Sequence, residues 1–171
     1  MFNLLRGVYL RYLAKKKPFI YARTMGVSVG AGTRFMSCKH GMFSTEPYLI
    51  SIGKNCLITG EVQFITHDGS VYHLKKKHPK ADLFGSIKIG DNVFIGFRSI
   101  VLPGVEIGSN VIIGAGSVVS KSIPPNSVAA GVPAKVISNI DDYLTKIEKR
   151  IIHTGGMPFA EKKKIVLASL K

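Results

Sequence analysis

Cysteine and long apolar runs are scarce in this chain, and tryptophan is absent. Its 171 residues contain two cysteines, Cys38 and Cys56, which is too few for a disulfide framework or a cysteine-based metal cluster. No apolar run approaches the roughly 18 residues of a membrane span. Arg6 and Arg11 interrupt the apolar N-terminal stretch that a signal peptide would need. We therefore expect a cytoplasmic protein with reduced thiols, in which Cys56 packs as a small buried side chain.

Acidic residues are also few, and this imbalance indicates an anionic partner. The chain has 24 Lys and Arg against 10 Asp and Glu, which gives a formal net charge of +14 at pH 7. Nucleic acid, an anionic membrane surface and a phosphate-bearing ligand all attract such a chain, and charge alone does not choose among them. Because no recognised nucleic-acid-reading motif accompanies the charge, we expect no nucleic-acid partner and favour a phosphate-bearing cofactor.

The most informative feature of the sequence is a period of six residues between Ile87 and Ile123. Apolar or small residues occur there in pairs two apart, and residues two apart on an extended strand share one face. Each pair therefore predicts a short strand with one buried face. The pairs are Ile87 and Ile89, Val93 and Ile95, Ser99 and Val101, Val105 and Ile107, Val111 and Ile113, and Ser117 and Val119.

Turn-forming residues separate the pairs. They include Gly90-Asp91-Asn92, Pro103-Gly104, Gly108-Ser109-Asn110 and Gly114-Ala115-Gly116, which suit the backbone angles of a corner. A strand and a corner repeated every six residues predict a chain wound into a coil whose turns stack on one continuous core. An antiparallel sandwich is the alternative, but its turns are usually about eight to twelve residues apart and hold no single period.

Residues 27–137 resemble the hexapeptide-repeat acyltransferases. The segment from Ile123 to Ile137, IPPNSVAAGVPAKVI, is similar to the one that closes the coil in the sugar, maltose and serine acetyltransferases of this family. The resemblance implies an all-β solenoid, a left-handed parallel β-helix with three flat sides. It also implies acetyl-CoA as co-substrate and a homotrimer whose active sites lie between adjacent subunits.

We expect three segments along the chain. Residues 1–24 form an N-terminal helical cap, residues 25–137 form the β-helix with an inserted loop at 65–86, and residues 138–171 form a C-terminal helical segment. In the last segment, one helix from Asp141 to Ile152 ends before Gly155-Gly156, and a second runs from Pro158 to Leu170. We expect both helices to pack against the coil or to support a trimer.

Residues 2–17 are predicted to form an amphipathic helix with basic residues on its other side. We favour a cap over the open end of the coil, since the ends of solenoids need cover. Peripheral contact with an anionic membrane is the alternative. The apolar stripe of this helix comprises Phe2, Leu5, Val8, Tyr9, Tyr12 and Leu13.

The candidate catalytic residue lies where the coil gives way to the loop at 65–86. Long loops inside compact repeats are usually functional or mobile, and this one carries three of the five histidines. A hydroxyl attacks a thioester only when a base takes its proton, and an imidazole suits this task at neutral pH. His67, in the sequence FITHDG, resembles the catalytic histidine at the same junction of the sugar and maltose acetyltransferases. We therefore predict that His67 is the general base of a direct acetyl transfer.

A carboxylate is expected to orient His67. We choose Asp68 as this partner, although adjacent residues on an extended chain point to opposite faces. Glu46, Glu61 and Asp82 are the alternatives, and the sequence does not decide among them.

The other histidines are weaker candidates. His78 lies in an HPK sequence that resembles a loop of serine acetyltransferases in which the histidine is not the base. His40, in an earlier break of the coil, is a candidate to face the acceptor. His73 and His78 together with His67 are the only nearby set for a zinc site, and no histidine lies in the coils after residue 86. We expect no metal.

The resemblance also implies contacts with the cofactor. Lys121 is similar to the family lysine that meets a phosphate of coenzyme A, a task that suits a mobile ammonium group. Ala115 and Ser120 match contacts along the pantetheine arm, and Lys135 stands where a basic residue near the nucleotide is common.

Two aromatic residues depart from the family pattern. Phe94 and Phe97 occupy coil positions where the family often has a tryptophan and a small residue, and we expect them to contact the cofactor. An exposed flat face that carries Phe94, Phe97 or Ile100 would also be consistent with a subunit interface.

The leading hypothesis is an O-acetyltransferase that acts on the hydroxyl of a sugar or sugar conjugate, in surface polysaccharide synthesis at the cytoplasmic side of the membrane. Serine or antibiotic acetylation is the alternative within the enzyme class, although the N-terminal helical region is far smaller than serine acetyltransferases carry. A γ-type carbonic anhydrase uses the same coil but needs three histidines around zinc. A non-catalytic β-helix scaffold, which would not bind coenzyme A, is the remaining alternative.

Overall fold

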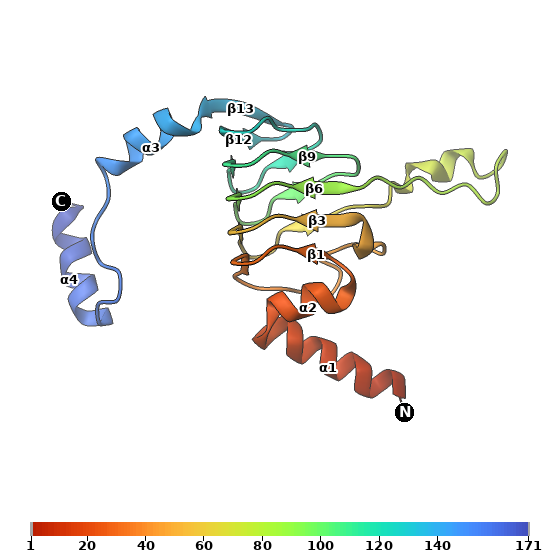
Figure 1. The fold of residues 1–171 in the computed structure, drawn as a ribbon, viewed down its shortest axis with the longest axis horizontal. Helices are drawn as coiled ribbons and strands as arrows, with labels where there is room; N and C mark the ends of the chain where they lie inside the picture. Colours follow the sequence, from red (N-terminus) through yellow and green to blue (C-terminus); the bar gives the residue numbers. More distant parts are fainter. Residues whose placement is uncertain (1, 171) are drawn as a thin grey trace. The chain divides into compact units, whose positions relative to one another are not determined.

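The computed structural model describes residues 2–170, with side chains from residue 5 onward. The chain divides into two compact units, one that ends at Ile140 and one that begins at Asp141, and each is described by itself. Figure 1 shows the course of the chain. The expected division at residues 24 and 137 stays a prediction.

Successive strands of the first unit pass in turn through three sheets of parallel strands (Figure 1). The first sheet holds β1 (Ser28–Val29), β3 (Ile50–Ile52), β6 (Ile87–Ile89) and β9 (Glu106–Ile107). The second holds β2 (Arg34–Phe35), β4 (Leu57–Ile58), β7 (Phe94–Ile95) and β10 (Ile112–Ile113), and the third holds β5 (Gln63–Phe64), β8 (Ile100–Val101) and β11 (Val118–Val119). From β3 to β11 the chain completes three circuits, and each of them adds one strand to each sheet, which confirms the predicted stack of parallel strands.

The core is the interior of this coil. Every residue of the six predicted pairs is buried, and none is more than 4% exposed. The two inward serines keep their hydroxyl groups paired in this apolar interior. Ser99 donates to the carbonyl oxygens of Gly96 and Gly114, and Ser117 donates to the carbonyl of Gly114. A serine therefore fits at an inward position because the neighbouring corner supplies its acceptors.

Most turns that lead into the strands of the second sheet have an asparagine at the same position. Asn55, Asn92, Asn110 and Asn126 all have φ between +55° and +58°, a left-handed conformation that asparagine tolerates better than most residues. The side chains of the last three also form a ladder, because Asn92 donates to Asn110 and Asn110 donates to Asn126 at 3.1 and 2.9 Å. This ladder of amides stabilises the corner and fixes the spacing of successive coils.

The closing segment ends the coil with a hairpin. β12 (Ser127–Gly131) joins the second sheet beside β10, and β13 (Ala134–Asn139) pairs antiparallel with β12. The turn between them holds a cis peptide bond at Val132–Pro133. The antiparallel strand thus covers the edge that a further parallel strand would otherwise extend.

The N-terminal segment forms two helices, α1 (Phe2–Lys16) and α2 (Pro18–Met25), where the sequence predicts one. α2 lies against β1 and β2 and buries Tyr21 and Ala22, while α1 lies against α2 (Figure 1). The short second helix therefore provides most of the cover at this end of the coil.

The prediction that the apolar stripe of the N-terminal helix packs on the coil is wrong for most of its residues. Leu13 is buried, but Leu5, Val8, Tyr9 and Tyr12 are 52–63% exposed, and the side chain of Phe2 lies outside the described residues. The packed face of α1 is formed instead by Leu10, Leu13 and Ala14, which are three and four residues apart.

The second unit contains α3 (Ile140–Glu148) and α4 (Phe159–Ser169). α3 ends at Glu148, four residues earlier than predicted, and residues 149–154 lead into the turn at Gly155-Gly156 without helix. Both helices are fully described, and neither buries a residue. Their predicted packing or trimer-supporting roles stay predictions. No helix within residues 2–170 combines the length and the apolar character needed to cross a bilayer.

Candidate functional site

A two-stranded stem holds the root of the loop at 65–86. The amide of Asp68 donates to the carbonyl of Leu83, and the amide of Gly85 donates to the carbonyl of Thr66, at 2.8 and 2.9 Å. His67 lies between these bonds and pairs antiparallel with Phe84. Because both strands of the stem are fixed where the loop leaves the third sheet, His67 has a defined position.

The stem also packs on the next coil. A Cβ atom added to Gly85 would clash with the backbone amide of Gly104, at the corner that follows β8. Only glycine allows this close approach of two backbones. The loop therefore leaves the coil in one direction, and His67 is held against the body of the protein.

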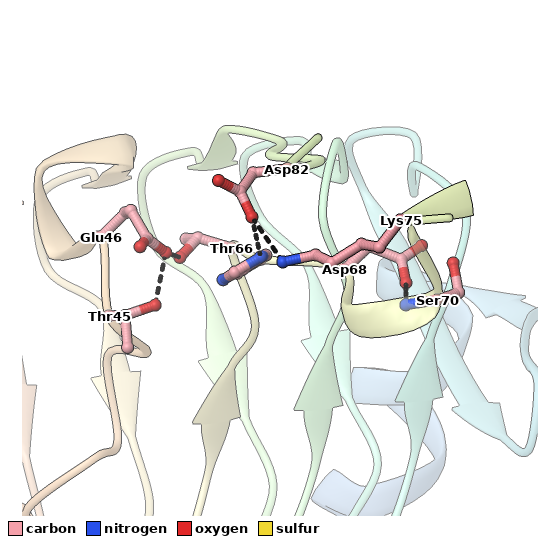
Figure 2. A network of polar contacts seen from close by, with 8 residues as sticks. Thr45, Glu46, Thr66, Asp68, Ser70, Lys75 and Asp82 are labelled. Carbon is pink, nitrogen blue, oxygen red and sulfur yellow. Dashed lines mark hydrogen bonds and ion pairs between the residues drawn. The ribbon is translucent and has the colours of Figure 1, made fainter. Parts of the chain in front are cut away.

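The imidazole of His67 is partly open to solvent, with 34% of the side chain exposed. Its ring lies 4.7 Å from the ring of Phe84, at an interplanar angle of 42°. Its Nε2 atom lies 3.7 Å from Oδ1 of Asp82, and Nζ of Lys75 lies 3.6 Å from the same oxygen (Figure 2). Both separations are longer than a hydrogen bond but suit charge attraction. A carboxylate shared between an imidazole and an ammonium group thus lies at the mouth of the stem.

Asp68, the partner chosen from the sequence, has a different contact. Its carboxylate accepts a hydrogen bond of 2.8 Å from the amide of Ser70 at the start of the 3-10 helix η2 (Gly69–Leu74), as Figure 2 shows. This hydrogen bond lowers the pKa of the Asp68 carboxyl below its ordinary value. The predicted orienting role of Asp68 stays a prediction, but the carboxylate that faces His67 in the structure is that of Asp82.

Two further carboxylates were alternatives. Glu46, which precedes the 3-10 helix η1 (Pro47–Leu49), accepts from the hydroxyls of Thr45 and Thr66 at 2.6 and 3.2 Å (Figure 2). Thr66 is fully buried and directly precedes His67, so Glu46 reaches the same stem from an earlier part of the chain. Glu61 lies at another corner, where hydrogen bonds from Lys39 and Arg98 lower the pKa of its carboxyl to about 2. The Glu61 carboxylate is therefore already paired with two basic residues at that corner.

The remaining histidines lie apart from this stem contact. His73 and His78 are exposed in the outer part of the loop, and His40 lines a cavity of about 210 Å³ beside α1. Within residues 2–170 no group of three His, Cys, Asp or Glu residues is placed to hold a metal ion.

The six predicted cofactor residues fall into three places on the coil. Phe97 and Ala115 lie at the corner between the second and third sheets, where the amide of Gly116 donates to the carbonyl of Phe97. Lys135 joins them, because it pairs with Ala130, whose side chain lies against the backbone of Gly114. Phe97, Ala115 and Lys135 are all exposed, so this corner can receive a ligand.

Ser120 and Lys121 lie at the next corner, after the third sheet. β11, which they follow, is two strands from β5, which the loop at 65–86 follows, and all strands of this sheet are parallel. With about 4.8 Å between strands, Lys121 lies roughly 10 Å along the coil from the point where the loop leaves. Phe94 lies apart from the other five predicted cofactor residues. It is on the outer face of β7, in register with Leu57 and Ile112. The structure therefore does not bring all six residues together on one chain.

Sequence reasoning missed Arg98. Its guanidinium lies 5.1 Å from the centre of the Phe97 ring and forms an ion pair of 2.7 Å with Glu61. It has φ of +60°, which is rare for a non-glycine residue. The signal was present in the sequence, because Arg98 follows Phe97 at a corner where the next coil has Gly116.

Comparison with known proteins gives the family. The family described as bacterial transferase hexapeptide (six repeats) matches residues 86–121. The chain is 46% identical to Protein CapG of Staphylococcus aureus, over 98% of this chain and 97% of that protein. It is 41% identical to galactoside O-acetyltransferase of Escherichia coli (strain K12), over 74% of this chain and 61% of that protein.

A solved structure agrees with this assignment. The structure of a galactoside acetyltransferase in complex with coenzyme A matches 90% of this chain and 86% of its own, with 27% identity and a TM-score of 0.54. The six-residue repeat and the stacked parallel strands fit the same group. The chain therefore belongs to the hexapeptide-repeat acyltransferases, and it is an acyltransferase.

Proposed function

We propose that the protein moves an acetyl group from acetyl-CoA to a hydroxyl of a sugar or sugar conjugate. The observation that carries this proposal is the position of His67, an imidazole partly open to solvent, fixed by the stem, with a carboxylate 3.7 Å from Nε2. Two relatives support the substrates, because the galactoside O-acetyltransferase is named for a sugar acceptor and the solved one holds coenzyme A.

The reaction needs one proton acceptor and no covalent enzyme intermediate. His67 takes the proton from the acceptor hydroxyl as that oxygen attacks the acetyl carbonyl of acetyl-CoA. The tetrahedral intermediate then collapses, its C–S bond breaks, and the imidazolium returns the proton to the leaving thiolate of coenzyme A. Backbone N–H groups of a neighbouring coil stabilise the oxyanion. The carboxylate of Asp82 stabilises the imidazolium while it exists.

The cysteines support direct transfer over a thioester on the enzyme. Cys38 and Cys56 are both free and buried. Burial raises the pKa of the Cys38 thiol to about 12 and also raises the pKa of the Cys56 thiol. The nucleophile in thiol chemistry is the thiolate, so neither residue is prepared to take up the acetyl group.

We extend the proposal to the fold and the assembly. The coil is a left-handed parallel β-helix, and three chains form a homotrimer in which His67 of one chain faces the later coils of the next. Lys121 binds a phosphate of coenzyme A. The rest of the cofactor is contacted by Phe94, Phe97, Ala115, Ser120 and Lys135. The separation of these residues on one chain supports the trimer, because a second chain can bring one corner of the coil opposite the other.

The proposal extends to the cellular setting of the reaction. We propose that the acceptor is a building block of a surface polysaccharide and that the reaction takes place in the cytoplasm. Support comes from the two reduced cysteines, which suit a reducing compartment, and from the sugar named in the relatives.

The test follows free thiol release from acetyl-CoA with a panel of sugars and nucleotide sugars. We expect acceptor-dependent release by the wild type and a fall of about a hundredfold or more in His67→Ala, since general-base catalysis typically contributes at least that much. His78→Ala, an exposed histidine of the same loop, is the matched control and keeps its activity. Thiol release only with serine or an aminoglycoside would assign the acceptor to that class instead of the sugars. Absence of both thiol release and coenzyme A binding would favour a non-catalytic scaffold.

A further inference from the structure

α1 carries two apolar faces, and the coil uses one of them. Leu13 and Ala14 are buried, and Leu10 packs against the same core. The opposite face is formed by Leu5, Val8, Tyr9 and Tyr12, which are 63%, 58%, 56% and 52% exposed. These four residues follow the spacing i, i+3, i+4 and i+7, so they form one continuous stripe along the helix.

The surroundings of this exposed stripe are strongly basic. The first acidic residue of the chain is Glu46, so α1, α2 and the first coil contain no carboxylate side chain. The basic residues before Glu46 are Arg6, Arg11, Lys15, Lys16, Lys17, Arg23, Arg34 and Lys39. Lys15 and Lys16 occupy the last turn of α1, directly after the stripe. The apolar stripe and the basic residues around it together indicate a partner that is both apolar and anionic.

A second copy of this chain fits that description poorly. The same face of another copy would bring two sets of basic residues together, and like charges repel. Two of the carboxylates that a second copy might offer, Glu61 and Glu106, already form ion pairs with basic residues of their own chain. An anionic lipid surface supplies both requirements, because its acyl boundary takes the apolar side chains and its headgroups take the lysines.

We propose that the exposed stripe of α1 docks on an anionic lipid bilayer. Leu5, Val8, Tyr9 and Tyr12 enter the boundary between headgroups and acyl chains, where tyrosine suits the change from apolar to polar surroundings. Lys15 and Lys16 reach the lipid phosphates. The helix lies in the plane of the surface, as its 15 residues and its basic rim require. This inference does not depend on the identity of the acetyl acceptor.

Flotation of the full chain with vesicles tests the proposal. One set contains phosphatidylcholine with phosphatidylglycerol, and the other contains phosphatidylcholine alone. We expect binding to the anionic set that weakens as the salt rises from about 0.1 to 0.5 M, since screening shortens the reach of the lysines. Binding to the neutral set should be at least roughly tenfold weaker.

Two leucines give a matched pair of variants. Leu5→Glu places a carboxylate in the stripe, whereas Leu167→Glu makes the same change at a leucine of α4 that is 56% exposed. We expect the first variant to bind anionic vesicles at least roughly tenfold less tightly and the second to bind like the wild type. Both sites are exposed, so both variants should keep the wild-type circular dichroism spectrum.

The outcomes separate this proposal from the enzymatic one. Thiol release with a soluble acceptor should be unchanged in Leu5→Glu, because the stripe lies outside the catalytic residues. Equal loss of binding in both leucine variants would overturn the proposal in favour of a general charge effect. Absence of vesicle binding by the wild type, with a change of oligomeric mass in Leu5→Glu, would assign the stripe to a subunit interface instead.

Discussion

Asp82 gives the sharpest test of the proposed site, because the structure and the sequence favour different carboxylates. Asp82→Asn removes the negative charge 3.7 Å from Nε2 of His67 and keeps the shape of the side chain. In this variant, the imidazolium that forms when His67 takes a proton from the acceptor lacks the attraction of that charge. We therefore expect a lower kcat/KM in Asp82→Asn at unchanged folded concentration.

The size of the effect follows from Coulomb's law. At this separation two unit charges attract by about 1 kcal/mol in water and by about 4 kcal/mol at a dielectric constant near 20. The side chains of His67 and Asp82 are 34% and 45% exposed, so solvent screening places the value near the lower limit. About 1 kcal/mol corresponds to a fall of about fivefold in kcat/KM.

Asp68→Asn is the matched control. The side-chain oxygen of asparagine can still accept the hydrogen bond from the amide of Ser70, as asparagine does at helix N-termini. We expect kcat/KM within about twofold of the wild type. The assay is initial thiol release at several acceptor concentrations, with saturating acetyl-CoA. A larger loss in Asp68→Asn than in Asp82→Asn would refute this reasoning and restore the partner chosen from the sequence.

Two further predictions concern stability. Gly96→Ala should lower the urea midpoint, with a cost of about 1–3 kcal/mol, because its Cβ would lie 2.5 Å from the amide nitrogen of Ala115 on the next coil. Gly7→Ala, with nothing within 4 Å of its Cβ, should raise the midpoint, with a gain of up to about 1 kcal/mol in the free energy of unfolding, and a fall in both variants would contradict this reasoning. Burial raises the pKa of Cys38 to about 12, so its stabilising effect is present below the unfolded pKa near 9 and is lost as the pH rises towards 12. Melting temperatures from pH 8 to 10.5 should therefore fall more steeply in the wild type than in Cys38→Ala, and parallel curves would refute this.

The six-residue period predicted the coil because it is a local property of the chain. A residue two positions from its partner must face the same side of a strand, whatever surrounds it, and each of the predicted inward positions is buried. The same logic applied to residues 2–17 chose the wrong face of α1. A helix with apolar residues around most of its surface has no single face that the sequence alone marks as buried, and Leu10 and Ala14 packed where Tyr9 and Tyr12 were expected.

The place of His67 at the root of the loop could be predicted from the sequence, but the carboxylate that faces its imidazole could not. The junction between coil and loop is visible in the sequence as the point where the period stops. Asp82 is fifteen residues further on, and it reaches His67 because Leu83 and Gly85 pair with Asp68 and Thr66 across the stem. That pairing depends on the close approach of Gly85 to the next coil, which involves residues far apart in the sequence.

Contacts between coils follow a second period, which comes from the architecture. Three six-residue repeats, each a strand and a corner, make a coil, so residues 18 apart lie one above the other, as Asn92 and Asn110 do through their side chains. Across the loop at 65–86 the separation becomes 37, as between Glu61 and Arg98. The loop therefore adds residues to the chain without changing the stacking of the coils. Because the stack is unchanged, the loop is free to vary in length and composition while its root, and with it His67, keeps its place on the coil.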